Sequence, residues 1–394
     1  MKETRFKYTD IGPIPEDWEV YKLGNLGLFS KGKGISRAEA QTGSIPAIRY
    51  GEIYTIHNDY IKSFHSFISE SVASRSIPLT MGQILFTCSG ETKEDIAKAV
   101  AFLGNEKAYV GGDIIVLTPK IECSSQFLGY LCNTANTNKQ KAEAAQGDAV
   151  VHIASESVKN IIIPLPPFDE QERIAEALSD VDALIAELDK LIAKKRLIKQ
   201  GAMQQLLTGH TRLPGFSDPW ENLTIKNAGY FKSGDFTNPQ FISSYQNESL
   251  FPCYGGNGLR GYTPFHNYDG VKIVVGRVGA LCGNVHLTAG PFQATEHALI
   301  FFPSIPINIP WLAYLLSFME LGQYAIGNAQ PVLTQSNLSE LEISLPSLSE
   351  QRAIATILSD LDSEIFFMEQ KKSRYQLIKQ GMMQQLLTGR IRLI

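Results

Sequence analysis

The segment Leu197-Ile-Lys-Gln-Gly-Ala-Met-Gln-Gln-Leu-Leu-Thr-Gly209 recurs as Leu377-Ile-Lys-Gln-Gly-Met-Met-Gln-Gln-Leu-Leu-Thr-Gly389, with twelve of thirteen positions identical at a sequence offset of 180. Upstream, Glu170-Gln171 matches Glu350-Gln351 at the same offset. A repeat of this length indicates a duplicated domain rather than a solenoid of short units. The chain is therefore interpreted as two copies of one unit, each a globular part followed by a helical part.

The offset between the copies changes toward their N-terminal ends. Trp18 and Gly32 match Trp220 and Gly234 at an offset of 202, so the first globular part carries 22 extra residues. We predict four segments, with globular parts at 1–168 and 215–348 and helical parts at 169–214 and 349–394.

Composition limits the class of protein. The chain has 394 residues, of which 44% are hydrophobic, and five cysteines without a CxxC pair. These values exclude a disordered chain, and they argue against a disulfide framework or a zinc ribbon. The first ten residues contain no apolar run of the kind that a secretory signal needs, so we expect a cytoplasmic protein. A net charge of −4 argues against a general nucleic-acid binder.

Apolar residues at heptad spacing predict that both helical parts are long helices. In the first copy, one column contains Ile174, Val181 and Leu188, and the other contains Leu184 and Leu191. Asp169 and Ser349 are the expected N-caps. Gly209 and Gly389 are expected to end the helices in the left-handed conformation.

Charge is sorted along each helical part. Residues 169–189 contain eight acidic and one basic side chain, whereas 190–214 contain six basic and no acidic ones; the second copy repeats this order. Antiparallel pairing sets each acidic half beside a basic half and also suits both helix dipoles. We predict an intramolecular antiparallel coiled coil that joins two α+β globular domains with pseudo-two-fold symmetry. The alternative is two amphipathic helices that each pack only on their own domain.

With these features the chain resembles the specificity subunit of type I restriction–modification enzymes. The resemblance covers essentially the whole chain. It is carried by Pro164-Leu-Pro-Pro-Phe-Asp-Glu-Gln171, by Leu345-Pro-Ser-Leu-Ser-Glu-Gln351 and by the two QQLLTG ends, with further support from Ile48-Arg-Tyr-Gly-Glu-Ile53 and Val275-Gly-Arg-Val-Gly279. Ser347 replaces the proline that the first copy has at Pro167.

The resemblance implies a fold and a function. Each globular part would be a target recognition domain that reads one half of a bipartite double-stranded DNA sequence. The helices would set the spacer between the half-sites and dock two methyltransferase subunits, and restriction subunits would join the complex. Adenine methylation would take place on partner subunits that carry S-adenosylmethionine, so this chain would need no cofactor and perform no catalysis.

Basic, amide and aromatic side chains next to glycine-rich turns are the candidate DNA contacts, because such groups reach phosphates and base edges. The second globular part has only five basic residues against nine acidic ones, so some of those five must contact DNA if this part binds it. The candidates are Lys31, Lys33, Arg49, Tyr50, Lys93, Lys232, Tyr254, Asn257, Arg260 and Arg277.

The repeated helix ends are the candidate partner-binding surface. A glycine inside a helix costs about 1 kcal/mol relative to alanine, so its recurrence indicates close approach by a neighbour or inheritance through duplication. The candidates are Gly201, Gln204, Gln205, Leu206, Gly381, Gln384, Gln385 and Leu386.

No catalytic motif fits the sequence. The run from Gly27 to Lys33 approaches a P-loop, but Gly34 stands where a magnesium-binding Ser or Thr is required. The seven histidines show no metalloenzyme spacing, and His152 and His297 are expected to be structural. No metal, cofactor or membrane partner is therefore expected. The alternatives that stay open are a coiled-coil scaffold that binds only proteins and the specificity subunit of a related defence methylase without a restriction motor; a stand-alone enzyme is disfavoured.

Overall fold

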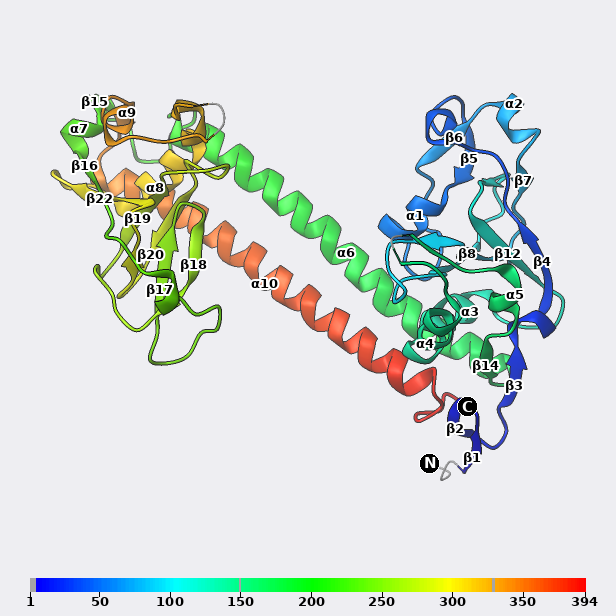
Figure 1. The fold of residues 1–394 in the computed structure, drawn as a ribbon. Helices are drawn as coiled ribbons and strands as arrows, with labels where there is room; N and C mark the ends of the chain where they lie inside the picture. The colour runs from blue at the N-terminus through cyan, green and yellow to red at the C-terminus, as the bar shows by residue number, and fades with distance from the viewer. Residues whose placement is uncertain (1–4, 149, 328–329) are drawn as a thin grey trace. The chain divides into compact units, whose positions relative to one another are not determined.

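The computed structural model describes residues 5–148, 150–327 and 330–394, and it divides into two compact units. Unit 1 comprises Met1–Glu187 and Lys371–Ile394, and unit 2 comprises Leu188–Gln370. Each unit therefore contains one globular part and a segment of each long helix (Figure 1). The prediction about the N-terminal sequence rests partly on residues 1–4, which lie outside the described residues.

Two four-stranded sheets form the globular part of unit 1. The main sheet is antiparallel, in the order β10-β8-β12-β4, and the second sheet has the order β6-β5-β11-β7, in which β11 and β5 run parallel. Their bounds are β4 Gly27–Lys31, β8 Ile84–Thr87, β10 Ala99–Ala101, β12 Ile114–Pro119, β5 Ile45–Ile48, β6 Ser66–Ile68, β7 Ile77–Pro78 and β11 Tyr109–Val110.

Shorter elements complete unit 1. The paired strands are β1 Phe6–Thr9 with β2 Gly12–Pro15, β3 Glu19–Lys22 with β14 Ile162–Leu165, and β9 Ser89–Gly90 with β13 Val151–His152. The helices are α1 Tyr50–Thr55, α2 Glu70–Ala73, α3 Ser125–Leu131, α4 Ala135–Ala144 and α5 Ser155–Lys159, with 3-10 turns η1 Leu23–Asn25 and η2 Arg37–Glu39.

Unit 2 repeats this plan. Its main sheet has the order β16-β22-β19-β20, its second sheet the order β18-β17-β21, and β15 pairs with β23. The strands are β15 Glu221–Thr224, β16 Gly229–Ser233, β17 Phe251–Gly255, β18 Gly258–Thr263, β19 Lys272–Gly276, β20 Val285–Thr288, β21 Gln293–Ala294, β22 Ala298–Pro303 and β23 Glu342–Leu345. The helices are α7 Ile225–Ala228, α8 Ile309–Phe318 and α9 Gln335–Ser339, with 3-10 turns η3 Pro239–Phe241 and η4 Leu321–Tyr324.

Strand register shows that the duplication includes the sheets. In unit 1, β4 and β8 flank β12, and in unit 2, β16 and β19 flank β22, with antiparallel pairing throughout. The second sheets each contain one parallel pair, β11 with β5 and β21 with β17. The two globular parts are therefore copies of one α+β domain.

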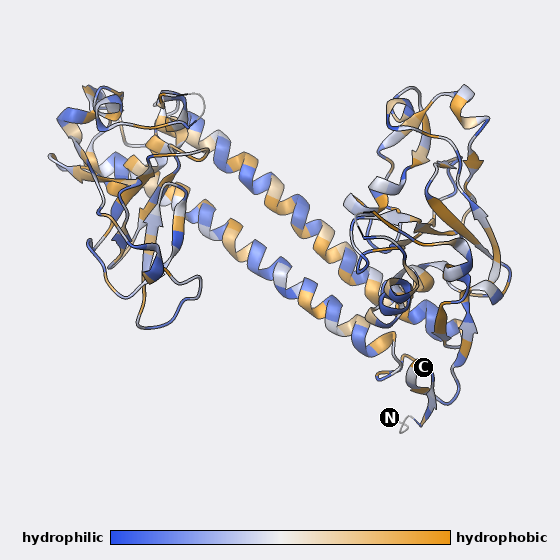
Figure 2. Cartoon of the chain, viewed as in Figure 1, coloured by the Kyte–Doolittle hydropathy of each residue, from blue (hydrophilic) through white to orange (hydrophobic). Residues whose placement is uncertain are grey.

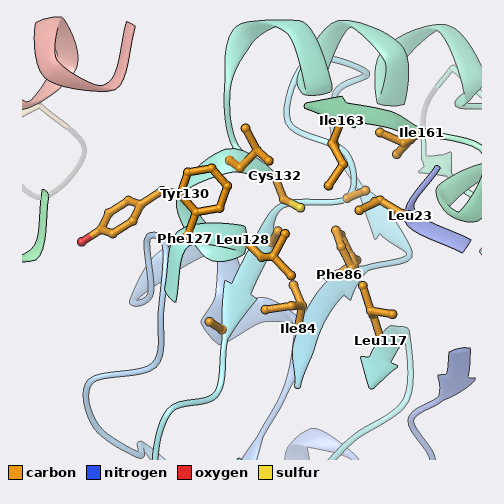
Figure 3. Packing of buried hydrophobic residues seen from close by; sticks show 14 of the residues in the cluster. Leu23, Ile84, Phe86, Leu117, Phe127, Leu128, Tyr130, Cys132, Ile161 and Ile163 are labelled. Carbon is orange, nitrogen blue, oxygen red and sulfur yellow. The ribbon is translucent and has the colours of Figure 1, made fainter. Parts of the chain in front are cut away.

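The core of unit 1 lies between the main sheet and α3. Phe127 and Leu128 of α3 pack in one buried cluster with Ile84 and Phe86 of β8 and Leu117 of β12 (Figure 3). Each of these side chains is fully buried, and burial of one such side chain contributes about 1.5–3 kcal/mol. In unit 2, α8 supplies the corresponding side chains, among them the fully buried Trp311.

Two long helices, α6 Phe168–Leu207 and α10 Leu348–Leu386, complete the structure. In unit 1, Lys379 of α10 lies 2.9 Å from Asp182, and Arg392, beyond the end of α10, lies 2.6 Å from Glu170. In unit 2, Lys199 lies 2.6 Å from Asp362, and Lys195 lies 2.5 Å from Glu364. Residue numbers rise on one helix as they fall on the other, so the helices are antiparallel within each unit. The predicted fold class is confirmed.

The predicted heptad column of Leu184 and Leu191 is wrong by one residue. Ile174, Val181 and Leu188 are buried as expected, but the second buried column contains Leu178 and Ile192, whereas Leu184 and Leu191 are 44% and 43% exposed. Hydrophobic residues recur along α6 (Figure 2), and in the sequence they fill adjacent columns, as at Leu184 and Ile185. The packing against α10, and not the apolar pattern alone, therefore decides which column is covered.

Both predicted N-caps lie two residues too late. The N–H groups of Glu170 and Gln171 donate to the carbonyl of Pro167, and Asp169 is already helical. In the second copy, Ser347 caps α10, because its carbonyl accepts from Gln351. The helix stops were predicted correctly, since Gly209 and Gly389 have φ of +68° and +67°.

The repeated Glu-Gln pair fastens each long helix to its globular part. In unit 1, the carboxylate of Glu170 accepts from Trp18 Nε1 at 3.0 Å and from Arg392 Nε at 2.6 Å. In unit 2, Glu350 accepts from Trp220 Nε1 at 3.1 Å and from Arg212 Nε at 2.7 Å. The segment after α10 thus binds the start of α6, and the segment after α6 binds the start of α10. This repeated contact explains why Trp and Glu recur in both copies.

The neighbouring glutamine satisfies backbone groups at the same point. Gln171 donates to the carbonyl of Pro166 at 2.8 Å and accepts from the N–H of Ser124 at 2.9 Å. Gln351 makes the same two contacts with Pro346 and Asn308. Among the described residues, no helix is long and apolar enough to cross a membrane.

Candidate nucleic-acid interface

In unit 1, the candidates Arg49 and Tyr50 lie at the start of α1, directly after β5. Arg49 is the residue that precedes the helix, and its N–H donates to the carboxylate of Glu52 at 3.5 Å. Glu52 is buried and also accepts from Ser66 of β6, which anchors the helix to the second sheet. Tyr50 is 41% exposed. This anchoring fixes the backbone while leaving the Tyr50 side chain open to a ligand.

A cavity of about 930 Å³ lies on one side of α1. Its lining is largely polar, and its four carboxylates outnumber its two lysines. Lys98 is half-buried within it, and Nζ donates to the carbonyl of Tyr54 at 3.2 Å. Burial lowers the pKa of Lys98. The lining residues are Tyr50, Gly51, Tyr54, Thr55, Asn58, Asp59, Ser89, Gly90, Glu91, Glu94, Asp95, Lys98, Asn133, Asn138, Val150 and Lys379. A carboxylate there can accept from the amino group of cytosine.

A second cavity, of about 910 Å³, shares Tyr50 with the first and is richer in arginine. Arg37, Arg49 and Arg75 all line it, and Arg75 forms an ion pair with Glu39. Three guanidinium groups around one opening suit phosphate oxygens or the acceptor edge of guanine.

The other three candidates of unit 1 lie outside both cavities. Lys31 ends β4, Lys33 follows it in the loop, and Lys93 lies in the turn after β9; all three are exposed. Their placement allows contact with a long ligand but does not gather them into one site.

In unit 2, the glycine-rich turn between β17 and β18 borders a cavity of about 370 Å³. Asn257 and Arg260 line it and are exposed. The other lining residues include Val278, Gly279, His297 and Gln330. A Cβ at Gly258 would lie 2.5 Å from His286 Nε2, and its φ is +80°, so this position requires glycine. The predicted pair of Asn257 and Arg260 is therefore brought to one opening.

Arg277, Lys232 and Tyr254 have different environments. Arg277 is half-buried, and its Nη1 donates to Ser233 Oγ at 3.2 Å. Lys232 is exposed on β16. Tyr254 packs its ring against Phe292 at 5.8 Å, and burial raises the pKa of its hydroxyl, so this side chain contributes to the core of the second sheet.

The candidate partner-binding residues separate by exposure. Leu206 and Leu386 are buried in the cores of units 2 and 1, whereas Gln204 and Gln384 are exposed. Gln205 is half-buried, as is Gln385, and Gln205 accepts from the Thr211 hydroxyl at 2.9 Å. A Cβ at Gly201 or Gly381 would meet no atom within 4 Å, so nothing within the described chain approaches these glycines closely.

Some residues of the interface were not predicted. Arg37 and Arg75 line the arginine-rich cavity, and Lys98, Asp59 and Lys379 line the acidic one. Arg37 follows the glycine-rich turn at 32–34 and could have been found from that position. Lys379 and Asp59 come from opposite ends of the chain, and no local pattern connects them.

Within residues 5–148, 150–327 and 330–394, no group of three His, Cys, Asp or Glu side chains could hold a metal ion. Burial raises the pKa of the Cys88, Cys123 and Cys253 thiols to about 11, so these groups are poor nucleophiles at neutral pH.

Comparison with known proteins agrees with this description. Residues 15–197 and 221–375 match the family model described as the type I restriction modification DNA specificity domain. The EcoprrI specificity subunit of Escherichia coli is 33% identical over 246 residues, which cover 60% of this chain and 61% of that protein. The MjaVIII specificity subunit of Methanocaldococcus jannaschii is 25% identical over 99% of this chain and 97% of that one.

Two solved structures share the fold. One is described as the S subunit of a type I restriction–modification system from M. genitalium, with a TM-score of 0.65, 17% identity and coverage of 94% of this chain and 96% of that one. The other comes from a study of complex assembly and conformational transition of the type I R-M system, with a TM-score of 0.58, 17% identity and coverage of 96% and 99%.

The family model matches both copies and leaves little of the chain outside it, and the relatives are named specificity subunits, which are noncatalytic components of their enzymes. The chain belongs to the type I restriction–modification DNA specificity family.

Proposed function

We propose that this chain selects the DNA sequence for a type I restriction–modification complex. Each recognition domain, 1–168 and 215–348, reads one half of a bipartite double-stranded target. The two long helices set the spacer and dock two methyltransferase subunits, and restriction subunits join that complex. The protein works in the cytoplasm, where the DNA of a prokaryotic host lies.

The observation that carries this proposal is that one scaffold presents two different surfaces. The main sheets of the two units have the same strand order and pairing. The segments after β5 and β17 differ, because the first is helix α1 with Arg49 and Tyr50, and the second is a glycine-rich turn with Asn257. A repeated scaffold with unlike surfaces supports the reading of two unlike half-sites.

The charges of these surfaces support a division of labour with the partners. Each phosphate that a protein neutralises adds to affinity through counterion release. The second recognition domain has five basic residues, and Lys226 is paired with Glu340 at 2.7 Å. Few cations are left for phosphates, so we infer that the methyltransferase subunits supply much of the affinity. The isolated chain should bind random DNA weakly and with a shallow salt dependence.

Repetition also supports the docking of two copies of one partner. Leu197 of α6 and Leu377 of α10 correspond in the repeat and are 69% and 67% exposed. The exposed Gln204 and Gln384 correspond in the same way. Two like surfaces suit two identical subunits, whereas a partner present once would need only one. Together with Gly201 and Gly381, these side chains form the proposed docking surface.

Methylome sequencing of a host that carries the complex tests the proposal. The expected result is one gapped adenine-methylation motif that disappears when this chain is deleted. Absence of a gapped motif would exclude sequence selection and favour the coiled-coil scaffold. Removal of equal whole turns from α6 and α10 should shorten the spacer and leave both half-sites unchanged, and altered half-sites would contradict the role of the helices.

The alternative, in which this chain is the specificity subunit of a related defence methylase without a restriction motor, predicts the same gapped methylation motif. It differs in the partners that copurify with this chain, since no motor subunit would be present. Affinity purification followed by mass spectrometry therefore separates the two systems.

A further inference from the structure

Each recognition domain carries a basic side chain at the same end of its main sheet, but the strand that carries it differs between the two domains. Lys31 is the last residue of β4 and lies opposite Ile115 of β12. Ser233 is the last residue of β16 and lies opposite Leu299 of β22. The register of the two sheets therefore places Ser233 at the position of Lys31.

The strand on the other side of the central strand is β8 beside β12 in unit 1 and β19 beside β22 in unit 2. Here the basic residue belongs to unit 2 and the small uncharged residue to unit 1. Cys88 follows β8, and its carbonyl accepts from the N–H of Ile153 at 2.9 Å. Arg277 follows β19, and its carbonyl accepts from the N–H of Leu333 at 2.8 Å. Ile153 and Leu333 correspond at the offset of 180 that also relates the repeated helices. Arg277 therefore stands at the position of Cys88.

The basic group and its small neighbour interact in both domains. In unit 2, the guanidinium group of Arg277 donates to Ser233 Oγ at 3.2 Å. In unit 1, burial raises the pKa of the Cys88 thiol to about 11, and the nearby ammonium group of Lys31 lowers it by a smaller amount. Each domain thus keeps one cation and one small uncharged side chain at this point, with the two strands exchanged.

Both cations lack an acidic partner within the part of the chain that the structure describes, since no carboxylate there forms an ion pair with Lys31 or Arg277. Arg277 Nε is buried and has no hydrogen-bond partner among the described residues, and an unpaired buried donor is unfavourable. An anionic ligand that draws the guanidinium outward would remove this cost. Lys31 is exposed and already available.

We propose that Lys31 and Arg277 are one phosphate-contact position that occurs twice, each holding a DNA backbone phosphate at the equivalent step of its half-site. This inference rests on the proposed function. The charge is kept while its residue type and its strand change. A phosphate needs only a nearby cation, whereas reading of a base edge needs a fixed fork of donors. The pair therefore positions the DNA and does not select its sequence.

Salt dependence of DNA binding tests the role of each residue. The probe is a duplex that carries the methylated motif, bound to the full chain copurified with its methyltransferase subunits. Lys31→Gln and Arg277→Gln should each reduce the slope of log K against log salt by about 0.9 and weaken binding about three- to tenfold at 0.1 M salt. Lys139→Gln and Lys226→Gln, which remove exposed charges elsewhere in each domain, should leave the slope unchanged.

A transplanted charge gives the decisive comparison. The double variant S233K/R277Q moves the cation of unit 2 to the strand that carries it in unit 1, and it should restore the slope and affinity that R277Q loses. A thermal unfolding transition that matches the wild type shows for each variant that the fold is kept.

Three outcomes would overturn the inference: an unchanged slope in R277Q, no recovery in the folded double variant, or a changed half-site in the methylome of an R277Q host, which would assign base reading to Arg277. A wild-type complex without a gapped motif would instead overturn the proposed function on which the inference rests.

Discussion

The carboxylate clusters at the starts of α6 and α10 use the same residue types but differ in burial. In unit 1, Arg392 binds both Glu170 and Asp17, and its side chain is 9% exposed. In unit 2, Arg212 binds Glu350 alone among acidic side chains of the described chain, and its side chain is 27% exposed. The same repeated motif is therefore more deeply buried and more highly charged in unit 1.

The clusters around Lys199 of α6 and Lys379 of α10 also differ, because the cluster of unit 1 contains more carboxylates. In unit 2, Lys199 pairs with Asp362, which also accepts from the Tyr314 hydroxyl at 2.8 Å. In unit 1, Lys379 pairs with Asp182 and also with Asp59 at 2.7 Å. Asp59 comes from the segment after α1, so in unit 1 the helix is tied to the candidate interface by one additional carboxylate.

A third position completes the comparison. Lys141 of α4 is 1% exposed, and Nζ binds the carbonyl of Cys132 and, at 3.2 Å, Asn138 Oδ1. Leu321 corresponds to Lys141 at the offset of 180 and is fully buried. Because a buried charge stabilises a fold less than a well-packed apolar group does, the extra ionic groups of unit 1 contribute defined geometry more than stability.

The largest expected effect comes from the buried carboxylate. Glu170→Ala leaves Arg392 buried without its main partner, and it should lower the free energy of unfolding of unit 1 by about 3–5 kcal/mol. Glu350→Ala should cost less, because Arg212 is more exposed. Denaturant unfolding of both variants measures the difference. Glu340→Ala, which removes an exposed pair with Lys226, is the control, and equal losses in the first two variants would contradict the comparison.

Lys141→Met should stabilise unit 1 by about 2–3 kcal/mol at pH 7. Burial lowers the pKa of Lys141 to about 8 from 10.5, so folding of the wild type is disfavoured while the amine must carry its charge. This penalty is fully present below pH 8 and disappears as the pH rises toward 10.5. Unfolding measured from pH 7 to 10 should show wild-type stability approaching that of the variant. Leu321→Lys, the reverse exchange in unit 2, should destabilise.

Asp59→Asn should have a smaller effect, about 1 kcal/mol, because Lys379 keeps Asp182 and the cluster then resembles that of unit 2. Asn133 also donates to Asp59 at 3.3 Å, and the substituted amide can still accept from it. Thermal unfolding at low and high salt measures the loss, which should be insensitive to salt because the pair is buried. A loss as large as that of Glu170→Ala would show that the third charge is essential to unit 1.

The helices and their direction were predictable because their signals are local and repeated. Identical residues at an offset of 180 define the copies, and sorted charge along 169–214 indicates antiparallel pairing. The column that packs was not predictable, since the apolar pattern offers Leu184 as readily as Leu178 and only the partner helix distinguishes them.

The candidate interface was predictable only where its residues lie close together in the sequence. Glycine-rich turns led to Asn257 and Arg260, which do share one cavity. The offset of 202 already relates Lys31 to Ser233, but the correspondence of Cys88 with Arg277 was hidden, because insertions change the offset between the copies along the chain. Only strand register, a property of the folded sheet, identifies equivalent positions there.

The smallest expected effect concerns the exposed pairs between the helices. Lys195 Nζ lies 2.5 Å from Glu364 Oε2, and the two side chains are 32% and 50% exposed. A double-mutant cycle with Lys195→Ala and Glu364→Ala should therefore give a coupling energy of about 0.3–0.5 kcal/mol. This coupling should decrease in high salt. Such pairs set direction rather than stability, since parallel helices would bring like charges together. A coupling well beyond the range of exposed ion pairs, or one unaffected by salt, would mean that unit 2 depends on ion pairs as strongly as unit 1 and would remove the contrast between them.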